Sequence, residues 1–213
     1  MHGKNPAPDG YHHGDLKAEL IRLGLAALER EGAGALSLRA LAAEAGVSKA
    51  APYRHFPERE LFLGALADEG FRLLCLALEN ATAEGSGLPG MGRAYMAFAV
   101  ARPALYRLMN SELMCRMPAE LTGEARRSMR ILGAALAREA LVGEGSWELA
   151  LEGAADLRFA DEAAAAWGYI HGLVMLRIDR LFPAWLPEPD WDSLAGRLPS
   201  AGRSAPTPPR RGR

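Results

Sequence analysis

The sequence LSLRALAAEAGVSKAAPYRHF, residues 36–56, carries the most specific structural signal in this chain. Apolar residues recur at spacings of three and four over 38–45, which predicts a short helix ended by Gly46. A second short helix is expected from Ser48 to about His55. Two helices that cross steeply need a corner residue that tolerates a positive φ, and glycine does so without steric cost. The stretch therefore predicts a helix-turn-helix with Gly46 at its corner.

The polar residues of this stretch suit contact with double-stranded DNA. A short helix fits the major groove, where its first residues reach base edges and its flanks reach phosphates. Ser48 can present its hydroxyl and free backbone N–H groups to a phosphate, and Ser37 is similarly placed at the start of the preceding helix, with Arg39 beyond it. Lys49 can reach a base or a phosphate, while Tyr53 can offer its hydroxyl to a phosphate and its ring to a thymine methyl. The geometry alone is equally typical of an ordinary turn with a solvated, charged face.

The order of residues resembles the N-terminal domain of the TetR family from Tyr11 to Leu74. The matching pieces are YHHGDLK (11–17), LSLRALA (36–42) and AGVSKAAPYRHF (45–56), the last ending in the family's Tyr-x-x-Phe pattern. The resemblance implies a homodimeric, ligand-responsive repressor that reads a near-palindromic operator in double-stranded DNA. It also implies which residues lie at or near the DNA: Ser37, Arg39, Ser48, Lys49, Ala50, Tyr53 and His55. Lys49 and Tyr53 are expected to contribute most.

Pro52 falls inside the predicted recognition helix, where many family members have leucine. Counted from a cap at Ser48 it is the fourth helical position, whose N–H is the last of the four that lack an intrahelical partner. A short, stiff helix is therefore expected.

Beyond residue 85 the chain is rich in methionine and aromatic residues. Methionine adapts to irregular cavities and aromatic rings offer stacking faces, so these residues as a set predict a pocket for an apolar or aromatic small molecule. Taken singly, each is more typical of a plain helix core. The predicted ligand-binding residues are Met91, Tyr95, Met96, Phe98, Tyr106, Met109, Met114, Trp167 and His171.

Trp167 and His171, four residues apart on one helical face and followed by Gly172, resemble the Trp…His-Gly signature of the WHG-type C-terminal domain of one TetR subgroup. The stretch 94–110 is similar to the central helices of that domain. The resemblance implies that the last long helices pair across a two-fold axis, where Gly168 and Gly172 permit close contact; both glycines could equally face a neighbouring core helix. A hydrogen-bonded core histidine is favoured for His171 over a metal ligand, because no second histidine or carboxylate cluster has metal spacing.

The composition narrows the classes of protein to which this chain can belong. The 213 residues are 49% hydrophobic and 24% charged with a formal charge of −1, so DNA contact requires a local patch. The polar start and the lack of an apolar run of about 20 residues predict a cytoplasmic protein that does not enter the membrane. No catalytic, cofactor or metal motif favours an enzyme. A redox sensor built on Cys75 and Cys115 is disfavoured because Cys75 lies among leucines, and an activator of the same architecture remains open.

The expected fold is all-α, since helix-forming residues dominate and β-branched residues are scarce. The expected division is a flexible arm at 1–14, the helix-turn-helix domain at 15–57, a helical effector-binding and dimerisation domain at 58–197 and a disordered tail at 198–213. Asp15 is expected to cap the first helix, and 142–160 to be irregular. Beyond the helix-turn-helix, long helices are expected over 58–84, 103–113, 119–141 and 160–182, with an apolar segment through 89–100.

Overall fold

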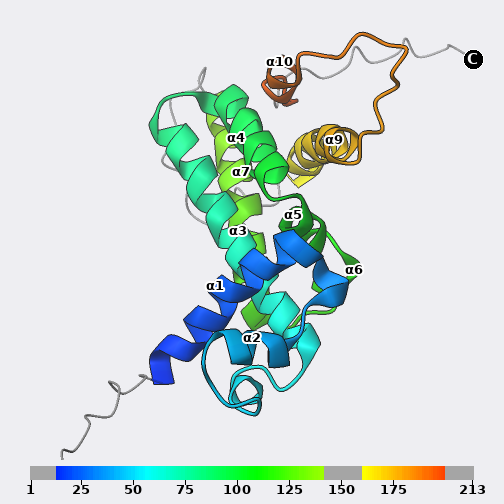
Figure 1. Cartoon of the computed structure of the whole chain (residues 1–213). Helices are drawn as coiled ribbons and strands as arrows, with labels where there is room; N and C mark the ends of the chain where they lie inside the picture. Colours follow the sequence, from blue (N-terminus) through cyan, green and yellow to red (C-terminus); the bar gives the residue numbers. More distant parts are fainter. Residues whose placement is uncertain (1–12, 142–159, 200–213) are drawn as a thin grey trace, which may run out of the picture.

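The computed structural model describes residues 13–141 and 160–199, and this part of the chain contains helices and no strands (Figure 1). The expected all-α fold is confirmed. The α-helices are α1 His13–Glu31, α2 Leu38–Glu44, α3 Arg59–Ala83, α4 Gly87–Ala101, α5 Pro103–Met109, α6 Glu112–Cys115, α7 Gly123–Leu141, α9 Ala160–Ile178 and α10 Trp191–Ala195. Three 3₁₀ helices span Ala33–Ala35, Pro52–Arg54 and Ala119–Leu121. Among the described residues, no helix combines the length and apolar composition that a membrane crossing requires.

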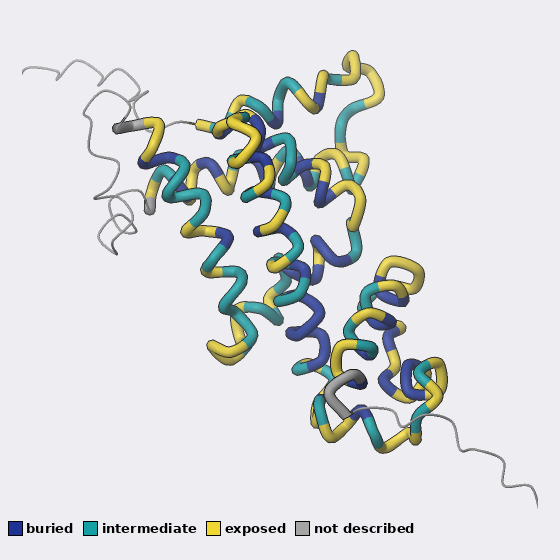
Figure 2. Tube along the Cα trace, turned by 90° about the vertical axis from the view of Figure 1, so that its left-hand side faces the viewer, coloured by how far each residue is buried: buried dark blue, intermediate teal, exposed yellow. Residues whose placement is uncertain are grey.

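α3 is the central element and packs against α4, α5 and α7 (Figure 1). The residues of α3 that face inward are buried along most of the helix. Figure 2 shows the buried residues of the whole described chain in dark blue. Gly70 allows α5 to cross α3 closely, because a Cβ added there would lie 2.7 Å from Met109 Sδ and 2.9 Å from Leu105 Cδ1. The close packing of these α5 side chains on the α3 backbone therefore depends on glycine at this position.

The N-terminal end of α3 also holds the small group formed by α1 and α2. α1 approaches α3 at Gly24, where an added Cβ would lie 2.5 Å from Phe62 Cζ. The Phe62 ring also meets the Phe56 ring edge-on, with 5.0 Å between centroids. The Arg59 guanidinium donates to the carbonyls of Leu36, at 3.3 Å, and Ala33. These contacts fix the α1–α2 connection on the first turn of α3.

Several predicted helix boundaries differ from those observed. α1 begins two residues before Asp15, so the predicted capping role of Asp15 is wrong. The predicted helix over 103–113 is interrupted after Met109, because the Asn110 and Ser111 side chains donate to the carbonyls of Tyr106 and Leu108.

Two further helices are shorter than predicted. α7 starts at Gly123, after a separate 3₁₀ turn at Ala119–Leu121, and not at 119. α9 ends at Ile178 and not at 182, because Arg180 adopts φ 54° and the Leu181 N–H donates to the Leu176 carbonyl at 2.9 Å. This left-handed turn is the Schellman type of helix end, here without glycine.

α10 lies in a stretch for which no element was predicted. The Asp190 side chain caps it by accepting from the Ser193 N–H at 3.0 Å, and it docks on α4 where Gly92 leaves no room for a side chain. Leu198, predicted to begin the disordered tail, packs against the core, so that boundary is too early. The predicted arm through residue 12, the irregular segment at 142–159 and the tail from residue 200 lie outside the described residues.

Candidate nucleic-acid interface and ligand cavity

The first half of the predicted helix-turn-helix is confirmed. Ser37 caps α2, its hydroxyl accepting from the Ala40 N–H at 3.4 Å. Gly46 turns the corner at φ 69°, and the Val47 N–H donates to the Ala42 carbonyl at 2.9 Å. Ala42 is fully buried, as the close approach of the two segments requires.

The predicted recognition α-helix from Ser48 to His55 is wrong. A turn at Ser48 leads into the 3₁₀ helix Pro52–Arg54, with the Ala51 N–H donating to the Ser48 carbonyl at 2.9 Å and the His55 N–H to the Pro52 carbonyl at 3.0 Å. In an α-helix capped at Ser48, the Ser48 carbonyl would accept from the N–H of residue 52, so the expectation that this N–H needs no partner is wrong. Proline has no N–H, and its ring crowds that carbonyl. Pro52 is buried and holds the tighter winding in place.

The predicted DNA-contacting residues surround this turn. Exposed side chains belong to Ser37, Arg39, Ser48, Lys49, Ala50 and Tyr53, whereas His55 is half-buried. Tyr53 is 41% exposed and therefore accessible to a partner. Figure 1 shows α2 and this turn at the opposite end of the molecule from α10.

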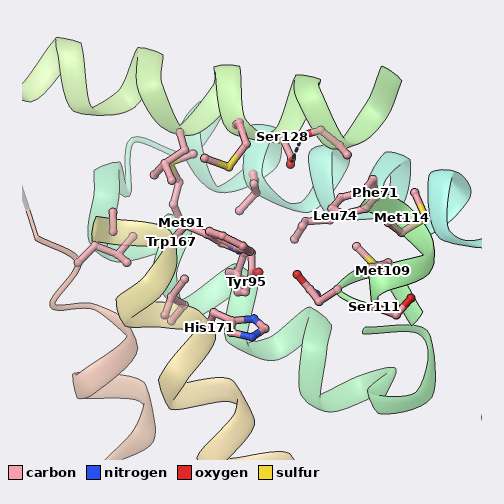
Figure 3. Close-up of a pocket in the computed structure, with 18 of the residues that line it drawn as sticks. Phe71, Leu74, Met91, Tyr95, Met109, Ser111, Met114, Ser128, Trp167 and His171 are labelled. Atoms are coloured by element: carbon pink, nitrogen blue, oxygen red, sulfur yellow. Dashed lines mark hydrogen bonds between the residues drawn. The ribbon is translucent and has the colours of Figure 1, made fainter. Parts of the chain in front are cut away.

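A cavity of about 410 Å³ lies between α3, α4, α5, α6, α7 and α9 (Figure 3). Six of the nine predicted ligand-binding residues line it: Met91, Tyr95, Met109, Met114, Trp167 and His171. Sequence reasoning missed its other residues, which include Phe71 and Leu74 on α3, Asn110 and Ser111 after α5, and Ser128 on α7. The α3 residues have the periodicity of ordinary core positions, so nothing in the pattern separates them from the rest of the helix.

The other three predicted residues, Met96, Phe98 and Tyr106, do not line the cavity. Successive helical residues point about 100° apart, so Tyr95 and Met96 cannot face the same space. Met96 packs instead with Ile170 of α9 and Trp191 of α10. Phe98 is buried in the main core, and Tyr106 is fully buried behind the cavity wall.

A chain of hydrogen bonds runs along this wall. The Tyr95 and Tyr106 hydroxyls are 3.2 Å apart, and the Tyr106 hydroxyl is 2.6 Å from His171 Nδ1. Burial raises the pKa of both tyrosines and lowers the pKa of His171. All three side chains are therefore neutral near pH 7. His171 is hydrogen-bonded as predicted, but it also belongs to the cavity, and no group of three potential metal ligands occurs in the described residues.

The two cysteines differ in setting. Cys75 is buried, its thiol donates to the Glu124 carbonyl at 3.6 Å, and burial raises its pKa to about 11. It is therefore a protonated, unreactive thiol at neutral pH. Cys115 is exposed and lines the cavity.

One contact joins the N-terminal group directly to the cavity wall. The Glu29 carboxylate of α1 accepts from the backbone N–H groups of Ala104, at 3.2 Å, and Leu105, at 2.8 Å, in the first turn of α5. The last residue of α5, Met109, lines the cavity. α5 therefore spans from α1 to the space a ligand would occupy.

Comparison with known proteins matches both halves of the chain. Residues 20–66 match the family model described as bacterial regulatory proteins, tetR family, and residues 88–198 match the model described as tetracyclin repressor-like, C-terminal domain. None of the curated protein sequences matches the chain.

Solved structures share the fold. A protein of unknown function from Rhodococcus sp. RHA1 is 30% identical, with 88% of this chain and 93% of that chain covered and a TM-score of 0.68. SCO4313, a protein described as regulatory, is 24% identical over 90% of this chain and 98% of its own, also with a TM-score of 0.68. A regulatory protein of the tetR family from Rhodococcus RHA1 is 19% identical over 87% and 97%, with a TM-score of 0.55.

Proposed function

Because the chain belongs to the tetR family of bacterial regulatory proteins, whose members are DNA-binding transcription factors and not enzymes, we propose that it is a ligand-released transcriptional repressor. It binds a near-palindromic operator as a homodimer and leaves it when a small molecule enters the cavity. The observation that supports the proposal most directly is the exposure of Lys49 and Tyr53 on a turn that packs against buried residues.

DNA contact is proposed through Ser37, Arg39, Ser48, Lys49, Ala50, Tyr53 and His55. The exposed Lys49 ammonium and Tyr53 hydroxyl suit phosphate contact, and the Tyr53 ring can meet a thymine methyl. The 3₁₀ winding at Pro52–Arg54 shortens the element that enters the groove. A shorter element makes fewer base contacts for each subunit. Because the chain also has no net basic charge, the second subunit is essential for affinity.

Dimerisation is proposed through α9. A Cβ added at Gly168 or Gly172 would meet nothing within 4 Å in the described part of the chain, so neither glycine supports a core contact there. Leu176, 37% exposed, follows Gly168 and Gly172 at the same four-residue spacing, so all three lie on one face of α9. A helix surface with small residues and exposed apolar side chains suits close packing against a second copy.

Ligand response is proposed to travel along two elements. α3 begins beside the helix-turn-helix and reaches the cavity, and α5 connects the cavity to Glu29 of α1. A ligand changes operator affinity only if it binds the two conformations unequally. A coupling of about 1–3 kcal/mol is typical for such sites.

Transcription in vitro tests the direction of regulation. With a promoter that carries the bound sequence, a repressor lowers transcript yield and a bound effector restores it. An activator of the same architecture would instead raise the yield. A redox-responsive regulator is less favoured, because the Cys75 thiol is buried with its pKa raised to about 11.

A further inference from the structure

The cavity wall contains no formally charged side chain among the described residues. Most of its surface comes from methionine, leucine and aromatic residues, and its one titratable base, His171, is held neutral by burial. A ligand carboxylate or ammonium would lose its hydration in such a cavity without gaining an opposite charge. The wall therefore favours an uncharged ligand.

The chemistry of the two groups gives the direction of the hydrogen bond between Tyr106 and His171. A phenol hydroxyl is a better donor than a neutral imidazole N–H, and an imidazole nitrogen is a better acceptor than a phenol oxygen, so the Tyr106 hydroxyl donates to His171 Nδ1, which is 2.6 Å away. The Tyr95 hydroxyl, 3.2 Å from that of Tyr106, can then donate to the Tyr106 oxygen.

This direction fixes the tautomer of His171. A neutral imidazole that accepts at Nδ1 carries its hydrogen on Nε2. The Nε2 atom has no hydrogen-bond partner in the described part of the chain, and no buried side-chain nitrogen or oxygen there is unsatisfied. Nε2 is therefore accessible, on a residue that lines the cavity (Figure 3).

Two neighbouring hydroxyls do not compete as donors. The Ser111 and Ser128 hydroxyls donate to the carbonyls of Leu108 and Ala125, both at 2.8 Å. Asn110 uses one amide hydrogen on the Tyr106 carbonyl at 2.9 Å and keeps the second. His171 Nε2–H is the donor that lies among the aromatic residues of the wall, and both it and the second Asn110 hydrogen favour a ligand that carries an acceptor.

We infer that the effector is an uncharged, largely apolar molecule with a hydrogen-bond acceptor, such as a carbonyl oxygen, that accepts from His171 Nε2–H. This inference rests on the proposed role of the cavity as the effector site. It specifies the polar group that the ligand must carry, where shape alone would accept any apolar molecule of suitable size.

Matched probes test the inference by calorimetry on the full chain. One set is 2-acetylnaphthalene, its hydrocarbon isostere 2-isopropenylnaphthalene and its anionic isostere 2-naphthoate. A linear set is 2-decanone, 2-methyl-1-decene and nonanoate. In at least one set the ketone should bind about tenfold more tightly than the hydrocarbon, the scale of one buried hydrogen bond, and more tightly than the carboxylate.

Two variants assign the preference to the residue. His171→Phe, which keeps an aromatic ring, should bind ketone and hydrocarbon alike, whereas Met114→Leu, elsewhere on the wall, should keep the ketone preference. Equal binding of ketone and hydrocarbon by the parent chain, tighter binding of the carboxylate, or no binding of either set would overturn the inference. Sequence-specific DNA binding by the same preparation shows whether the proposed function stands when the ligand class fails.

Discussion

The Glu29 carboxylate and the Leu105 backbone N–H form a 2.8 Å hydrogen bond between residues 76 positions apart in sequence. The same carboxylate accepts from the Ala104 N–H, so a side chain of α1 caps α5. Pro103, which opens α5, has no N–H to satisfy. The capped helix leads directly to Met109 in the cavity wall.

Glu29→Ala should weaken this connection. Two backbone N–H groups would lose their acceptor, and the free energy of unfolding should fall by about 1 kcal/mol, as for loss of a helix cap. Chemical denaturation measures that change, and the ratio of operator affinities with and without bound ligand should move toward one. Glu84→Ala removes an exposed carboxylate at the end of α3 and should alter neither quantity. An unchanged affinity ratio in Glu29→Ala would exclude this route of coupling.

Lys49→Ala should weaken operator binding about tenfold or more in the dimer and reduce the salt dependence of affinity, because each subunit loses one phosphate-contacting cation. Fluorescence anisotropy at several salt concentrations measures both effects. Arg130→Ala removes an equal charge from an exposed position on α7 and serves as the control. Equal losses in the two variants would indicate only non-specific electrostatics.

Gly172→Glu should produce monomers, since a carboxylate on the open surface of α9 would be buried and unpaired in the proposed dimer. Light scattering on eluted protein measures the mass. Gly123→Glu adds the same charge at an open position at the start of α7 and should remain dimeric. A dimeric Gly172→Glu variant would place the interface elsewhere.

Gly70→Ala should destabilise the fold by about 1–3 kcal/mol, because the added Cβ would lie 2.7 Å from Met109 Sδ and force α5 away from α3. Gly133→Ala is the matched control, since an added Cβ there meets nothing within 4 Å and alanine favours the helix by about 1 kcal/mol. Thermal or urea unfolding of the pair measures the difference. Similar stabilities would mean that α5 shifts without cost.

The pattern of sequence signals explains which features could be predicted. Gly46 and Ser37 are local signals, and both occupy their expected roles. Pro52 is also a local signal. Its missing N–H and the clash of its ring outweigh the helical pattern of the residues around it, so the segment winds as a 3₁₀ helix. The hydrogen bond between Glu29 and Leu105 joins segments that are distant in sequence, and no periodicity of residues predicts such a contact.

The cavity shows the same limit of prediction from sequence. A set of methionine and aromatic residues predicted a pocket, but composition does not distinguish the face of Tyr95 from that of Met96 one residue later. Only the packing of α4 between α3 and α9 decides which of the two faces the cavity.

Acidification should destabilise the protein through His171. Burial lowers the pKa of its imidazole below the ordinary value of 6.5, so near and below that pH the unfolded chain binds a proton that the folded chain resists. The free energy of unfolding should therefore fall as the pH drops below about 6.5 and stay level, as far as this group is concerned, above it. Urea unfolding at pH 7.5 and pH 5.5 should show a smaller acid loss in His171→Gln than in the parent chain. An equal or larger loss in the variant would contradict the assignment.

Selection of bound duplexes from a random-sequence DNA pool at physiological salt tests the central claim most directly. The parent chain should enrich a near-palindrome. Tyr53→Ala, which removes the exposed ring and hydroxyl from the turn proposed to contact DNA, should not. Enrichment of the same sequence by both proteins would contradict the proposed role of the turn. Failure of the parent chain to enrich any sequence would contradict sequence-specific binding by this protein.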